Sequence, residues 1–205
     1  MLDGGCLYKQ YASDMTRFWP IGGRFSAPYQ LLYDILLTVQ KELIEYLTSG
    51  ERNIAREKLN MLSDELLIKY LREEMILSRT IDKYQAKRII DYLSPTGVSH
   101  HLGLDVHDCE ALAFSESLQS GNVITIEPGS ICFVFFCFNF YRFIFAGLYI
   151  PWKCPNIPEI YHGFAARIED DILITKQGCE NLSEQCPKEI NDLYRLLDLR
   201  NKEEK

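Results

Sequence analysis

Apolar residues change their spacing along the chain, and the first change separates two kinds of predicted structure. In the first 25 residues apolar and polar positions alternate on either side of Lys9-Gln10. This alternation predicts two strands, at residues 2–7 and 11–19, joined by a turn. From Ser26 the spacing becomes helical and continues to Gly50, and these two residues suit the start and the end of a helix.

Two further helices and then a set of short strands are expected after this first helix. Helical spacing occurs at residues 54–77, with a break near Ser63, and again at 81–93. Short β-rich runs bounded by proline, glycine and asparagine then predict strands at 123–127, 148–150 and 165–175. Helical spacing returns at 187–199, which predicts a terminal helix.

The order of strands, helices and strands favours an α+β fold over a repeating βαβ sheet. The chain has 205 residues, of which 47% are hydrophobic and 25% charged. This composition is typical of one globular domain with a sizeable core. The net charge of −7 and the pI near 5.2 leave no basic face for a phosphate backbone, so nucleic acid is not expected as a partner.

Cysteine usage and the first residues bear on the cellular compartment. The seven cysteines are odd in number and include no Cys-X-X-Cys pair, so we expect reduced intracellular thiols. The N-terminal residues contain neither a charged segment followed by an apolar stretch nor an arginine-rich amphipathic helix. We therefore expect no targeting signal in this chain.

Histidines are concentrated in one short segment. Three of the four histidines, His100, His101 and His107, fall within the motif SHHLGLDVHD at residues 99–108. A histidine pair alone is more often structural or solvent-facing than metal-binding. Other residues are needed to favour a metal site.

Four carboxylates favour a metal site near these histidines. Asp3 and Asp14 lie on the two predicted N-terminal strands and can share a face if these strands pair antiparallel. Glu127 ends an apolar strand, and Glu169 lies within another β-rich run. Apolar strands that carry acids inward need a cation to offset the desolvation of those charges. Four carboxylates and one imidazole suit manganese, magnesium or cobalt better than structural zinc.

Five short motifs along the chain resemble those of one known family. LDGG (residues 2–5), YASDMTR (11–17), SHHLGLDVHD (99–108), ITIEPG (124–129) and RIEDD (167–171) follow one another in the order seen in aminopeptidase P. The chain thus resembles the pita-bread metallopeptidases, and residues 180–191 are similar to the mitochondrial branch of Xaa-Pro aminopeptidases. The resemblance implies a curved antiparallel sheet flanked by helices and incomplete at the N-terminus, with residues 1–205 forming part of a catalytic domain.

The resemblance also implies a dinuclear centre of two divalent ions, with manganese favoured. Asp14 and Glu169 would bridge the ions, Asp3 would bind one of them, and His100 and Glu127 would bind the other. A hydroxide between the ions would attack the peptide bond between a first residue and a following proline.

Three residues have further roles by the same resemblance. Glu127 is expected to shuttle the proton of the water, His107 to face the substrate, and Arg167 to hold the acids or the substrate. The partners implied are peptides or proteins with proline at the second position, and no nucleic acid or membrane. Family members often form homodimers, and the location implied is mitochondrial or cytoplasmic.

Two departures from the family pattern leave an alternative open. The family has an active-site histidine four residues before the metal-binding one, where this chain has Thr96, which cannot act as an acid or base near neutral pH. A further histidine and the first elements of the domain precede Asp3 in the family. The chain is therefore either an Xaa-Pro aminopeptidase or an inactive relative that keeps the metal ligands, and we expect little hydrolysis from this chain as it stands. Prolidase and methionine aminopeptidase share the ligand set, but the motif around His107 favours aminopeptidase P.

An atypical apolar insertion occupies residues 130–147, between Gly129 and Leu148. Its length would allow a membrane span, but Asn139 and Arg142 would be costly there and the span would separate two ligands of one site. Without it the sequence reads EPGLYIP, as in the family. We expect either the translation of an unspliced intron, consistent with its phenylalanine content and its glycine-splitting borders, or a genuine apolar loop. Sequencing of the mature transcript would separate these two readings.

Overall fold

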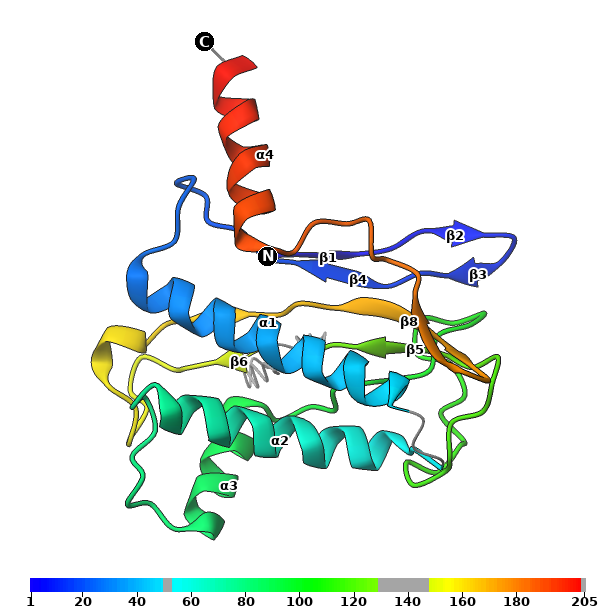
Figure 1. The fold of residues 1–205 in the computed structure, drawn as a ribbon, viewed down its shortest axis with the longest axis horizontal. Helices are drawn as coiled ribbons and strands as arrows, with labels where there is room; N and C mark the ends of the chain where they lie inside the picture. Colours follow the sequence, from blue (N-terminus) through cyan, green and yellow to red (C-terminus); the bar gives the residue numbers. More distant parts are fainter. Residues whose placement is uncertain (50–52, 129–147, 204–205) are drawn as a thin grey trace, which may run out of the picture.

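The computed structural model describes residues 1–49, 53–128 and 148–203, and it begins with two paired stretches of strand (Figure 1). β1 (Leu2–Gly4) pairs antiparallel with β4 (Met15–Arg17), and β2 (Leu7–Tyr8) pairs with β3 (Tyr11–Ala12). The turn between β2 and β3 has Lys9 at φ 50° and Gln10 at φ 74°. Positive φ at both central residues is the geometry of a tight hairpin turn. The predicted strand pair and its turn are confirmed, although each strand is interrupted.

Three helices follow, and each lies within a predicted helical run, although the second ends at Glu73 rather than at residue 77. α1 is Ala27–Thr48, α2 is Arg56–Glu73 and α3 is Lys83–Leu93. The predicted break near Ser63 is wrong, because α2 is continuous through that residue. Ser63 is fully buried in α2, where packing outweighs its weak preference against helix. Ser26 occupies the position before α1 but its side chain makes no capping hydrogen bond.

The strands after α3 form two small antiparallel sheets. β5 (Val123–Ile126), β8 (Asp170–Thr175) and β9 (Gly178–Asn181) form one sheet in the order β5-β8-β9. β6 (Leu148–Tyr149) pairs with β7 (Ala165–Ala166). The run predicted at 165–175 is therefore two strands, because β7 and β8 pair with different partners and the chain changes sheet at 167–169. The sequence did not predict β9, which contains glycine and polar residues and no apolar alternation.

The terminal helix is present but shifted from its predicted bounds. α4 spans Ile190–Glu203, and a short 3₁₀ helix, η1, spans Glu159–Tyr161. The backbone N–H of Leu193 donates to the carbonyl of Glu189 at 2.9 Å. The hydrogen bonding of the helix therefore begins at the carbonyl of Glu189. Residues 187–189 lie before this first turn, which explains why the predicted start at Pro187 is too early.

α1 packs across the strands and fixes which face of the sheet is free for chemistry. Figure 1 shows α1 lying across β5, β6 and β8. Fully buried residues of α1, among them Leu36 and Leu43, belong to the same core as Ile124 and Ile126 of β5. Burying each such side chain contributes about 1.5–3 kcal/mol. Because side chains alternate along a strand, Thr125 and the following Glu127 face away from this core.

The described residues contain no helix long and apolar enough to cross a membrane. The predicted apolar insertion at 130–147 lies outside the residues that the structure describes.

Candidate metal centre

Segments far apart in sequence bring the predicted ligands together. β1 carries Asp3, and Asp14 immediately precedes β4. His100 follows α3, Glu127 follows β5, and Glu169 lies in the short connection between β7 and β8. Each acid therefore sits at or beside a strand, where backbone pairing limits its movement.

His100 is at the centre of this cluster. Its Nε2 atom lies 3.5 Å from Asp14 Oδ2, 3.3 Å from Glu127 Oε1 and 4.0 Å from Glu169 Oε1. Ligand atoms of Asp14, His100 and Glu169 all lie within 4.8 Å of one another, a spacing at which one cation can reach all three. Glu127 joins this group through His100.

Arg167 connects the remaining acids. Its Nη1 lies 3.3 Å from Glu127 Oε2 and its Nε lies 3.6 Å from Glu169 Oε2. Its Nη2 pairs with Asp3 Oδ2. The Asp3 side chain is 39% exposed, whereas those of Arg167 and the two glutamates are buried. Asp3 thus lies at the open edge of the site, within reach of the guanidinium.

Two threonine hydroxyls orient the glutamates, and neither belongs to the predicted set of site residues. Thr16 Oγ1 donates to Glu169 Oε2 at 2.5 Å and accepts from Arg167 Nε at 2.7 Å. Thr125 Oγ1 donates to Glu127 Oε1 at 3.1 Å. Each threonine lies two residues from a predicted ligand on the same strand face, Thr16 from Asp14 and Thr125 from Glu127. Period-two spacing was the signal available in the sequence.

One buried oxygen of the cluster lacks a hydrogen bond. Glu169 is fully buried, and its Oε1 atom accepts no hydrogen bond from any residue that the structure describes. Buried carboxylate oxygens are normally paired, because an unpaired one costs free energy. Several carboxylates and one imidazole around this oxygen form a hard donor set, which fits a divalent cation such as manganese or magnesium.

The charges of the cluster are strongly coupled. Burial, followed by the negative charge of Glu127, raises the pKa of Glu169 to about 8, and burial also raises the pKa of Glu127. Burial disfavours a charged His100, but its hydrogen bond to Asp14 and the charges of the glutamates outweigh burial and raise its pKa to about 9. The cluster therefore favours added positive charge, whether a proton or a cation.

The other histidines of the motif occupy different places. The ring of His107 stacks on that of His100, with centroids 4.1 Å apart and planes 17° apart. His107 is exposed. Burial and the charge of His100 lower the pKa of His107. His101 is buried and its backbone pairs with Asp108 and Ile124.

Asp171 is a further contributor outside the predicted set of site residues. Both of its carboxylate oxygens lie within hydrogen-bond distance of the backbone N–H of Asp14, at 3.3 and 3.2 Å. Burial raises the pKa of Asp171 to about 6. This contact holds the backbone of Asp14 through its N–H group. The Asp14 carboxylate is not used in the contact and faces His100.

Comparisons with known proteins give the relatives of this chain. The model of metallopeptidase family M24 matches residues 1–176. Intermediate cleaving peptidase 55, mitochondrial, from Arabidopsis thaliana is 38% identical over 97% of this chain and 34% of that protein. Xaa-Pro aminopeptidase 3 from Homo sapiens is 34% identical over 96% of this chain and 34% of that protein. This chain spans about a third of the length of these two curated relatives.

A solved structure gives the corresponding likeness in three dimensions. A histidine-to-alanine variant of Escherichia coli aminopeptidase P is similar with a TM-score of 0.78 and 31% identity. The match covers 98% of this chain and 41% of that chain. The strands and helices that position the acidic cluster thus have counterparts in a known fold.

Proposed function

The chain belongs to metallopeptidase family M24, and we propose that its acidic cluster is the dinuclear metal centre of an Xaa-Pro aminopeptidase. The observation that carries this proposal is the approach of Asp14, His100 and Glu169 within 4.8 Å, with one buried carboxylate oxygen unpaired. The name of the human relative supports an aminopeptidase that acts before proline.

The chain offers a ligand for every position that such a centre needs. Asp14 and Glu169 would bridge two divalent ions, with Asp3 completing one shell and His100 and Glu127 the other. Bound ions would supply Lewis acidity, which polarises a peptide carbonyl and makes water a better nucleophile at neutral pH. Manganese is proposed because oxygen ligands predominate in this set.

Side chains of the centre would handle the proton and the substrate. Glu127 is proposed to accept the proton of the attacking water and return it to the leaving amine. Thr125 holds one Glu127 oxygen at 3.1 Å, which leaves the other to face Arg167 at 3.3 Å. The exposed edge of His107, stacked on His100, is proposed to contact the peptide.

The natural partners proposed are peptides or proteins with proline at the second position. Hydrolysis would release the residue before that proline. A mitochondrial location is proposed as well, which the name of the Arabidopsis relative supports.

A second candidate function is metal binding without hydrolysis. It is favoured by Thr96, which stands where the family has a histidine and whose hydroxyl lies 3.5 Å from the carbonyl of Gly97. A hydroxyl of this kind does not exchange protons near neutral pH as an imidazole does. The proposed enzyme should therefore work slowly with threonine at this position.

The test compares the chain with its Thr96→His and Asp14→Asn variants on a peptide beginning Xaa-Pro. With Mn2+ added, the aminopeptidase proposal expects slow release of the first residue, faster release by Thr96→His and none by Asp14→Asn. A matched peptide with alanine in place of proline should react more slowly. If neither the chain nor Thr96→His releases the first residue although both bind Mn2+, the chain is a metal-binding protein and the proposed activity is wrong.

A further inference from the structure

Gln40 joins the backbones that carry the two glutamates. This residue lies in α1 and is fully buried. Its Nε2 atom donates to the carbonyl of Ile126 and to the carbonyl of Ile168, each at 3.2 Å. Glutamine has two N–H donors on this nitrogen, so both are used. Ile126 and Ile168 immediately precede Glu127 and Glu169, and one amide therefore bridges the two ligand-bearing segments.

The bridge lies where regular strand pairing stops. The pairing of β5 with β8 ends at Ile126 opposite Asp170. Beyond this pair the chain leads to Glu127 on one side and back to Glu169 and Ile168 on the other. Strand pairing therefore does not set the distance between the segments that carry Glu127 and Glu169. The Gln40 amide of α1 connects these two segments instead.

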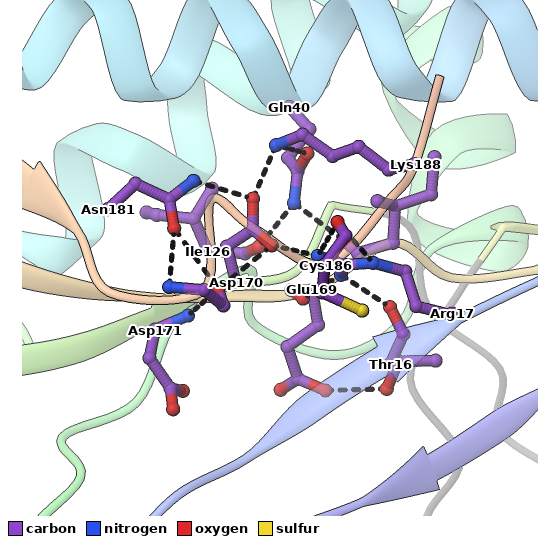
Figure 2. Close-up of polar contacts among 12 residues, drawn as sticks. Thr16, Arg17, Gln40, Ile126, Glu169, Asp170, Asp171, Asn181, Cys186 and Lys188 are labelled. Carbon is purple, nitrogen blue, oxygen red and sulfur yellow. Dashed lines mark hydrogen bonds and ion pairs between the residues drawn. The ribbon is translucent and has the colours of Figure 1, made fainter. Parts of the chain in front are cut away.

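Lys188 and Asp170 hold the glutamine in place. Lys188 Nζ donates to Gln40 Oε1 at 2.8 Å and also pairs with Asp170 Oδ2. Figure 2 shows Gln40 and Lys188 on the α1 side of the strand, with the Asp170 carboxylate directed toward them and the Glu169 carboxylate directed away. A fixed amide dipole of this kind cannot rotate without breaking its contact with Lys188.

Arg17 binds the backbone of Glu169 and the neighbouring carboxylate of Asp170. Its Nη1 donates to the carbonyl of Glu169 at 2.6 Å, and its Nη2 donates to Asp170 Oδ1 at 2.7 Å (Figure 2). The carbonyls of Ile168 and Glu169 are thus held by two different side chains of one network. The network touches the backbone on both sides of the Glu169 Cα atom, while the Glu169 side chain faces the proposed metal centre.

We propose that Gln40 is a positioning residue for the metal centre, which sets the separation between the backbones of Glu127 and Glu169 so that both carboxylates reach one cation. The inference rests on the proposed function of the acidic cluster. Metal sites tolerate ligand displacements of only about 0.2 Å in bond length. Loss of the bridge should therefore weaken cation binding more than it weakens the fold.

The test uses the full chain with two substitutions on the same helix. Gln40→Met keeps the length of the side chain but leaves the carbonyls of Ile126 and Ile168 without their donor. Tyr33→Phe is the matched control, because the Tyr33 hydroxyl lies seven residues earlier on α1 and donates to the carbonyl of Lys188 at 2.7 Å rather than to that of Ile126 or Ile168. Both variants lose hydrogen bonds from α1 to backbone carbonyls, but only one of them loses the bridge.

Mn2+ binding and metal-free thermal unfolding are measured for all three proteins. We expect both variants to unfold at a lower temperature than the parent chain. We expect Gln40→Met alone to raise the Kd of the weaker-bound Mn2+ at least tenfold, and its electron paramagnetic resonance spectrum to lose the signature of coupled ions. Equal Mn2+ affinities in Gln40→Met and Tyr33→Phe would overturn the inference.

Two further outcomes are decisive as well. If Gln40→Met does not fold, Lys188→Met is measured in its place, because this side chain is 15% exposed and also holds the amide. An Mn2+ affinity of Lys188→Met equal to that of Tyr33→Phe would then overturn the inference. If the parent chain binds no Mn2+, the proposed function fails and the positioning role fails with it, whereas normal binding by the parent and by Gln40→Met removes only the positioning role.

Discussion

Glu169 and Asp170 are neighbours in sequence, both fully buried, and have opposite surroundings. Asp170 receives four donors, two on each oxygen. Arg17 and Ser183 donate to its Oδ1, and Asn181 and Lys188 donate to its Oδ2. Glu169 has one oxygen bonded to Thr16 and the other without a hydrogen bond among the described residues. Figure 2 shows the two carboxylates on opposite sides of the strand.

The difference separates a structural carboxylate from one that is free to bind a cation. Burial opposes the charge of Asp170, but the positive charges of Lys188 and Arg17 outweigh burial and lower its pKa. Burial and the nearby Glu127 instead raise the pKa of Glu169 to about 8. On one side of the strand, Arg17 and Lys188 pair with the Asp170 carboxylate. On the other side, the described acids gather around the Arg167 guanidinium and the His100 imidazole.

The largest effect is expected from Asp170→Asn in the metal-free protein. Two cationic side chains would lose their carboxylate in a buried site, and breaking a buried ion pair in this way costs about 3–5 kcal/mol. Urea unfolding followed by circular dichroism measures this loss. A decrease in the free energy of unfolding below about 1 kcal/mol would mean that the Asp170 network is not structural.

The next effect is stabilisation of the chain by Mn2+. A ligand that binds only the folded state at one hundred times its Kd adds about 2.7 kcal/mol to the free energy of unfolding. Thermal unfolding with and without Mn2+, and again after a chelator, measures this gain. An unfolding temperature that does not respond to Mn2+ would contradict a cation site on the Glu169 side.

A smaller effect is expected from Glu169→Gln in the metal-free protein. Thr16 can still donate to the amide oxygen, and the repulsion from Glu127 is removed. The free energy of unfolding should therefore change by less than about 1.5 kcal/mol, the contribution of a single hydrogen bond. The same variant should lose most of its stabilisation by Mn2+. A destabilisation as large as that of Asp170→Asn would show that the two carboxylates have the same role.

The smallest effect is expected at an exposed ion pair. Lys41 lies 2.6 Å from Glu189, and both side chains are about half exposed. Exposed pairs of this kind contribute about 0–1 kcal/mol. Lys41→Met should therefore leave the unfolding curve nearly unchanged, which makes it a suitable control for the loss of a lysine that Lys188→Met also involves. If Lys41→Met lowered the free energy of unfolding as much as Asp170→Asn, burial would not explain why buried and exposed ion pairs differ.

The fold was predictable where the sequence has a clear period. The alternation around Lys9-Gln10 and the helical spacing of α1 gave the correct elements, and the α+β pita-bread fold expected from the motifs is confirmed by the likeness to aminopeptidase P. The wrong or missing secondary-structure predictions lie in segments where the hydrophobic periodicity of the sequence is weak. Ser63 does not break α2, because packing stabilises the helix, and β9 has no apolar alternation.

The candidate site was predictable to a different extent. The motifs pointed to Asp14, His100 and Glu169, which the structure brings together, and their roles as ligands stay predictions. The supporting residues were not predictable from these motifs. Gln40 looks like an ordinary polar position on a helix, and only the fold places it against the carbonyls of Ile126 and Ile168.

The most direct measurement is the number of Mn2+ ions bound by the chain and by its Asp14→Asn variant, determined by titration calorimetry and metal analysis. Because Asp14 is proposed to bridge both ions, we predict two bound ions for the chain and no tight binding for the variant. Circular dichroism of the metal-free variant shows whether its fold is kept. An unchanged stoichiometry in a folded Asp14→Asn variant would contradict the dinuclear centre.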